Sequence, residues 1–100
     1  MEASDITKYL NSVVDITAKV NSDILVTMTV DSIDYINNCI VCDLWEKYML
    51  VGGKHKFHSK YQYNNVGKHP TVDIVDIASI TLSNKGFSAI KYIIDTDLGI

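Results

Sequence analysis

The sequence predicts an α+β fold in which an N-terminal helix packs on a five-stranded, mainly antiparallel sheet made of hairpins. Three observations support this prediction: apolar residues at helical spacing near the N-terminus, alternating stretches on both sides of Gly52-Gly53, and a further turn signal at Asn84. The chain has 100 residues, of which 47% are hydrophobic and 21% charged, so we expect a single domain spanning residues 1–100.

The first expected element is an amphipathic helix over residues 5–20. Ser4 and Asp5 are residue types that cap helices. Apolar residues then recur at helical spacing, at Ile6, Tyr9, Leu10, Val13, Val14, Ile16 and Val20. The polar residues 21–23 are expected to end the helix, which would cover a partly apolar face of the sheet.

The next expected element is a strand that begins at Ile24, alternates to Val30 and continues toward Ile36. Asn37-Asn38 is typical of a two-residue turn. This turn predicts the pairs Val30 with Trp45, Met28 with Lys47 and Val26 with Met49.

Gly52-Gly53 predicts a central hairpin, because glycine tolerates the positive φ of type I′ and II′ turns. Folding there pairs Tyr48 with Phe57 and Trp45 with Lys60. One face would then be largely aromatic and aliphatic, with Cys42, Leu44, Tyr48, Leu50, Phe57, Tyr61 and Tyr63. The opposite face would be largely basic, with Asp43, Trp45, Lys47, Met49, Lys54, Lys56, His58, Lys60 and Gln62.

Residues 64–70 have the composition of a loop. Residues 71–83 fit both a strand and a helix. We prefer the strand, because Asn84-Lys85-Gly86 suits a three-residue hairpin turn. The predicted pairs across it are Leu82 with Ser88, Ile80 with Ile90 and Ala78 with Tyr92.

Charge is distributed unevenly along the chain. The net charge is −3, yet residues 47–72 contain five lysines, all three histidines and no acid. A mildly acidic chain with one basic block does not have the charge of a general nucleic-acid-binding protein. The chain also has no arginine but 13 isoleucines and 7 asparagines, a composition typical of AT-rich genomes such as those of low-GC bacteria, their phages and large viruses.

The N-terminal residues are acidic and lack the apolar core of a signal peptide. No apolar run reaches the ~18–20 residues that span a bilayer. Two cysteines in such a chain fit free thiols in a reducing compartment. We therefore expect a cytoplasmic protein, inside an infected host cell if the source is a virus or phage, without a membrane partner.

Cys39, Cys42, His55 and His58 have the spacing of zinc ligands. Both pairs are expected in strands, however, where positions three apart point to opposite faces. We therefore expect two buried thiols and two hairpin histidines, with no metal and no cofactor. Aromatic neighbours would raise the pKa of Cys42, and His55 is too distant to act as its base, so we expect no enzymatic activity.

The remaining candidate site is the basic face of the hairpin: Trp45, Lys47, Met49, Lys54, Lys56, His58 and Lys60. An aromatic residue beside lysines can anchor an acidic protein surface or stack a nucleic-acid base, whereas lysines alone can simply keep an edge strand from aggregating.

We expect a small non-enzymatic protein-interaction module that docks through a sheet face or edge on a protein partner or on a second copy of itself. A phage or viral accessory protein, an inhibitor of a host enzyme and a structural adaptor all fit this description. Single-stranded nucleic-acid binding is the alternative. The absence of arginine counts against it, because arginine usually provides the bidentate contacts to phosphate.

Overall fold

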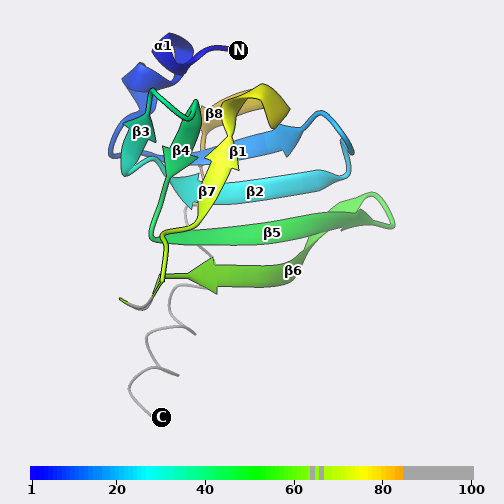
Figure 1. Cartoon of the computed structure of the whole chain (residues 1–100). Helices are drawn as coiled ribbons and strands as arrows, with labels where there is room; N and C mark the ends of the chain where they lie inside the picture. Colours follow the sequence, from blue (N-terminus) through cyan, green and yellow to red (C-terminus); the bar gives the residue numbers. More distant parts are fainter. Residues whose placement is uncertain (64, 66, 85–100) are drawn as a thin grey trace.

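The structure is a computed structural model that describes residues 1–63, 65 and 67–84 (Figure 1). In this part of the chain the elements are α1 (Ala3–Ile6), a 3₁₀ turn η1 (Thr7–Tyr9), β1 (Val13–Ala18), β2 (Ile24–Thr29), β3 (Ser32–Asp34), β4 (Cys39–Val41), β5 (Leu44–Val51), β6 (Lys54–Gln62), β7 (Thr71–Asp73), a second 3₁₀ turn η2 (Ile74–Asp76) and β8 (Ile77–Leu82). One antiparallel sheet has the order β6-β5-β2-β1-β8, and a smaller one the order β3-β4-β7. The predicted class, one helix on a mainly antiparallel five-stranded sheet, is confirmed.

The prediction of an N-terminal helix over residues 5–20 is wrong beyond Tyr9. The helical segment consists of α1 and η1 only, and Asn11, at φ 64°, turns the chain into β1. β-Branched residues dominate β1 and favour a strand, where their side chains pack well on a pleated surface. β1 also pairs with β2 on one side and β8 on the other, so hydrogen bonds to two neighbours override the helical spacing of its apolar residues.

β2 and β3 on one side, and β4 and β5 on the other, form one long hairpin that passes through both sheets. The pairs Met28 with Trp45 and Ile33 with Ile40 share a single register. The predicted turn at Asn37-Asn38 is present, but the connection between β3 and β4 has four residues. The predicted pair Val30 with Trp45 is therefore wrong by two positions, a shift that leaves the same side chains on the same face.

The long hairpin bends where it leaves one sheet and enters the other. Val30 and Cys42 are fully buried at this bend. The backbone N–H of Asp43 donates to a side-chain oxygen of Asp31 at 2.8 Å, and that of Cys42 donates to the carbonyl of Pro70 at 3.1 Å. These bonds replace the ladder bonds that the bend interrupts.

The central hairpin forms at Gly52-Gly53, whose φ angles of 58° and 79° confirm the expected positive-φ turn. The pairs nearest the turn, including Tyr48 with Phe57, match the prediction. A bulge then shifts the register by one residue, because both His58 and Ser59 follow Phe57 where β5 advances only to Lys47. Beyond the bulge the predicted pairing is wrong.

Residues 71–83 do form strands, but in two pieces that belong to different sheets. β7 pairs with β4, η2 turns the chain, and β8 pairs with β1. The helical alternative for this stretch is limited to the three residues of η2. Residues 85 and 86 of the predicted turn, and the residues Ser88, Ile90 and Tyr92 predicted to pair across it, lie outside the described residues.

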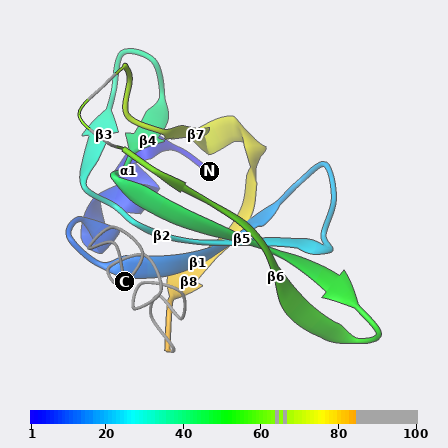
Figure 2. The ribbon, with the colours of Figure 1, turned by 90° about the horizontal axis from the view of Figure 1, so that it is seen from below.

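The core lies between the two sheets and beneath the N-terminal segment. Figure 2 shows the three-stranded sheet and α1 on one side of the five-stranded sheet. The buried side chains that meet there are Ile6, Val14, Ile16, Met28, Val30, Ile40, Cys42, Ile74 and Ile77. The face of the large sheet that contributes Val14, Ile16 and Met28 is called the core face below, and the opposite face the polar face.

Candidate interaction surface

The far end of the β5–β6 hairpin extends past the end of β2 and projects from the body of the molecule (Figure 2). The backbone N–H of Leu50 in β5 donates a hydrogen bond at 3.0 Å to the carbonyl of Asp23, the residue directly before β2. Beyond this point the hairpin has no neighbour among the described strands. The exposed fraction is 39% for Leu50, 54% for Val51 and 49% for Phe57.

The structure brings five of the seven predicted site residues to one face and separates the other two. Trp45, Lys47 and Met49 of β5 lie on the core face together with Lys54 and Lys56 of β6.

The other two residues are displaced by the bulge. Lys60 is paired with Glu46 and therefore lies on the polar face. His58 occupies the bulge, where its Nδ1 lies 3.0 Å from the hydroxyl of Ser59.

The predicted separation of an aromatic face from a basic face is present between the turn and the bulge, where Phe57 and Lys56 lie on opposite faces, and is wrong beyond the bulge. Tyr61 exchanges sides with Lys60 and stacks on Trp45 with ring centroids 6.2 Å apart. Phe57 and Lys56 are both exposed, on opposite faces of β6. The projecting hairpin therefore has no buried side at its tip and presents apolar and basic groups together.

Trp45 is not the exposed anchor that the sequence suggested. Its ring is half-buried, packs against the core and is flanked by Tyr61, which is 49% exposed. The exposed apolar residues that were missed are Leu50, Val51, Phe57 and Tyr61. For Leu50, Val51 and Phe57 the signal is the length of the hairpin, because strands of eight and nine residues beside a six-residue β2 overhang it. Tyr61 pairs with Trp45 beside β2 and lies outside this overhang.

A polar row crosses the polar face through all five strands of the large sheet. In register these residues are Thr81, Asp15, Thr27, Glu46 and Lys60. Thr27 and Glu46 are fully buried. The hydroxyl of Thr27 donates to Asp15 at 2.7 Å, and the hydroxyl of Tyr48 donates to Oε1 of Glu46 at 3.0 Å. These bonds satisfy buried polar atoms and make the row a structural network.

The two thiols, of Cys39 and Cys42, are both buried. Burial, with smaller contributions from Asp31 and Asp43, raises the pKa of Cys42 to about 12. Burial also raises the pKa of Cys39. Because the thiolate is the nucleophile, both cysteines lack the activation that covalent catalysis requires. Among residues 1–63, 65 and 67–84, no cluster of three or more His, Cys, Asp or Glu side chains is placed to hold a metal ion.

His69 fastens the segment after β6 to the bend of the long hairpin. Its Nδ1 lies 2.9 Å from Oδ1 of Asp43, and its ring stacks on Tyr63 at 3.8 Å between centroids. The backbone N–H of Tyr63 donates to the carbonyl of Asp43 at 2.7 Å. This contact anchors one end of the edge strand β6.

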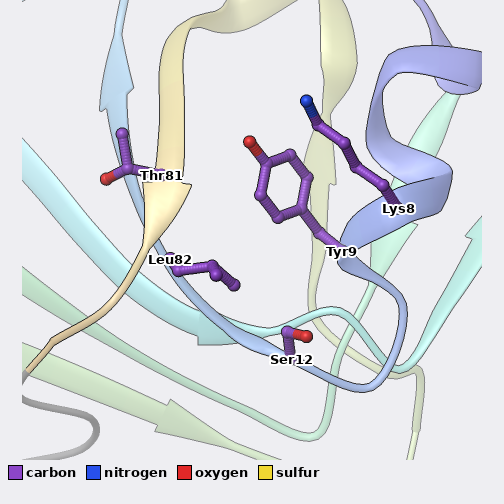
Figure 3. A pocket seen from close by; sticks show the side chains of 5 residues that line it. All are labelled: Lys8, Tyr9, Ser12, Thr81 and Leu82. Carbon is purple, nitrogen blue, oxygen red and sulfur yellow. The ribbon is translucent and has the colours of Figure 1, made fainter.

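An open pocket lies between η1 and β8 (Figure 3). Lys8 and Tyr9 enter it from the N-terminal segment, opposite Thr81 and Leu82 of β8, with Ser12 nearby. The Tyr9 hydroxyl donates to the carbonyl of Ile80 at 3.5 Å. These five lining residues include no histidine, cysteine or carboxylate.

Comparison of the chain with known protein families, with curated protein sequences and with solved structures found no match. Within the described part of the chain, no helix is long and apolar enough to cross a membrane.

Proposed function

We propose that this chain is a small non-enzymatic protein-interaction module that docks on another protein through the projecting end of the β5–β6 hairpin. The observation that carries the proposal is the group of exposed apolar side chains at this end, Val51 and Phe57 above all. Exposed apolar side chains rimmed by charges are typical of protein interaction sites. The charges within the hairpin are all basic, because residues 47–62 contain four lysines and no acid, so an acidic partner surface complements them.

Two further features support a non-enzymatic cytoplasmic role. The buried thiols with raised pKa are unsuited to nucleophilic chemistry, and free cysteines persist where the compartment is reducing. Together with the composition of an AT-rich genome, they fit an accessory protein of a phage or virus, such as an inhibitor of a host enzyme or a structural adaptor.

The test is affinity capture from host-cell lysate with an aromatic photo-crosslinking residue in place of Phe57, after light scattering has established whether the chain self-associates. We expect a saturable crosslink, to a partner or to a second copy, that Lys54→Glu with Lys56→Glu abolishes. Lys8→Glu with Lys19→Glu is the matched control, because both lysines are exposed, lie outside the hairpin and change the net charge equally. A monomer that captures nothing, or equal capture by both variants, contradicts the proposal.

Single-stranded nucleic acid is the second candidate, favoured by the position of Tyr61. Its half-exposed ring lies beside Trp45 on the face that carries Lys47 and Lys56, an arrangement suited to stacking a base and neutralising phosphates. Titration of Trp45 fluorescence with a thymidine oligonucleotide tests this. Quenching that weakens steeply as salt increases supports it, and unchanged fluorescence at low salt rejects it.

A further inference from the structure

We propose that β6 receives an extended, acidic partner segment as an additional strand of the large sheet. This inference rests on the proposed function and names the chemistry of the partner. Within the described residues β6 pairs with β5 alone and is therefore an edge strand. It is also the longest strand described, with nine residues from Lys54 to Gln62. Edge strands offer unpaired backbone donors and acceptors that template the addition of another strand.

The direction of the backbone groups near the hairpin tip follows from the bonds of β5. The N–H of Leu50 donates to Asp23, on the β2 side. Because successive residues of a strand point their amides to opposite sides, Val51 and Met49 face β6 and bond to Lys54 and Lys56. The amides of His55 and Phe57 consequently point away from β5, toward the free edge.

The side chains of four residues of β6, Lys54 to Phe57, define the sequence pattern of the partner. Lys54 and Lys56 lie on one face, whereas His55 and Phe57 lie on the other. An added strand places alternate side chains beside each set. Acidic residues would lie beside the two lysines, and apolar residues beside the half-exposed ring of Phe57. The preferred segment therefore alternates acidic and apolar residues.

Charge disfavours a second copy of β6 as the added strand. An antiparallel two-fold pairing centred on His58 places Lys56 of each copy directly opposite Lys60 of the other copy, which makes two lysine–lysine pairs. Like charges directly opposite one another destabilise strand pairs. No acid within β6 offsets them.

The experiment titrates the isotope-labelled full chain with an acetylated and amidated heptapeptide of alternating Glu and Val. We expect saturable binding and a slowing of hydrogen exchange by about tenfold or more at the amides of His55 and Phe57. The same peptide with alternate backbone amides N-methylated keeps its charge but cannot add as a strand, so we expect it to bind at least about tenfold more weakly.

Two variants separate charge from backbone pairing. Lys54→Glu with Lys56→Glu should lose the Glu-Val peptide and gain a Lys-Val peptide, whereas Lys8→Glu with Lys19→Glu should behave as the unmodified chain. His55→Pro removes one outward amide and should weaken binding more than His55→Ala.

No binding of the Glu-Val peptide, or equal binding of the N-methylated peptide, overturns strand addition. If the crosslink at position 57 is still lost in the Lys54→Glu, Lys56→Glu variant, docking through the hairpin stands and only the edge mechanism falls. If that crosslink is absent as well, the proposed function falls with it.

Discussion

At the scale of single residues, the buried carboxylate of Glu46 shows how the large sheet accommodates charge. Glu46 is fully buried, accepts a hydrogen bond from Tyr48 at 3.0 Å and lies opposite Lys60. Burying a carboxylate costs free energy that only such partners offset. Its neighbour in the row, Thr27, is held in the same way by Asp15 at 2.7 Å.

Tyr48→Phe should therefore destabilise the protein, because it keeps the ring contact with Phe57 but removes a donor from a buried carboxylate. We expect the free energy of unfolding to fall by about 1–3 kcal/mol, measured by urea denaturation. Tyr61→Phe is the matched control, because its ring is half exposed, and should change little. Equal effects of the two substitutions would contradict the role given to Tyr48.

The raised pKa of Cys42 leads to a prediction about stability at alkaline pH. Its pKa rises from an ordinary value of 9.0 in the unfolded chain to about 12 in the folded protein. The thiol therefore contributes stability that is fully present below pH 9 and is lost as the pH rises toward 12.

The measurement compares the chain with Cys42→Ala. The difference in their free energies of unfolding should narrow between pH 9 and pH 11, where the unfolded thiol ionises and the folded thiol does not. A difference that stays constant over this range would show that the thiol makes no such contribution.

At the scale of elements, the bulge in β6 decides which side chains share a face. Without it, Lys60 and not Tyr61 would lie beside Trp45. The bulge inserts His58 as an extra residue between the pairs Tyr48 with Phe57 and Lys47 with Ser59. A residue inserted in this way forms no ladder pair of its own.

Deletion of His58 should consequently preserve the pairing on both sides of the bulge while straightening β6. Nuclear Overhauser contacts should persist between Tyr48 and Phe57 and between Trp45 and Tyr61. His58→Ala, which keeps the extra residue, is the control. Loss of the Trp45–Tyr61 contact in the deletion variant alone would contradict this account, because His58 would then be more than an inserted residue.

The same hairpin shows how much of the fold could be predicted from the sequence. Gly52-Gly53 predicted the turn and the nearest pairs, because a two-glycine turn has local causes. The bulge has no local signal, since no glycine or proline marks it. The prediction for β1 was wrong because Ile16 lies at helical spacing from Val13 and also alternates with Val14. The pairing with β2 and β8 that decides between helix and strand is non-local. The sequence therefore predicted the hairpin itself and the faces of its side chains near the turn, but not the faces of Lys60 and Tyr61 beyond the bulge.

At the scale of the whole molecule, the short N-terminal segment matters more for packing than for secondary structure. Ile6 is fully buried and contributes to the core between the sheets. Ile36, in the turn between β3 and β4, is 96% exposed.

Ile6→Ala should reduce the free energy of unfolding by about 2–5 kcal/mol because it opens a cavity in this core. Ile36→Ala makes the same chemical change on the surface and should alter it by about 0.5 kcal/mol or less. Thermal and urea denaturation of both variants measure the contrast. A small effect at Ile6 would mean that the N-terminal segment is not needed to close the core.

The long hairpin that threads both sheets has a mechanical consequence. β5 begins at the bend, where Cys42 is buried, and ends at the tip where we place the partner. A pull exerted at the tip is carried along an unbroken strand, held by β2 for most of its length, to the point where the two layers join. β3 and β4 of the small sheet belong to the same long hairpin as β2 and β5, so the two sheets cannot separate without distorting that hairpin. Both sheets together would therefore resist a force that a bound partner applies at the tip.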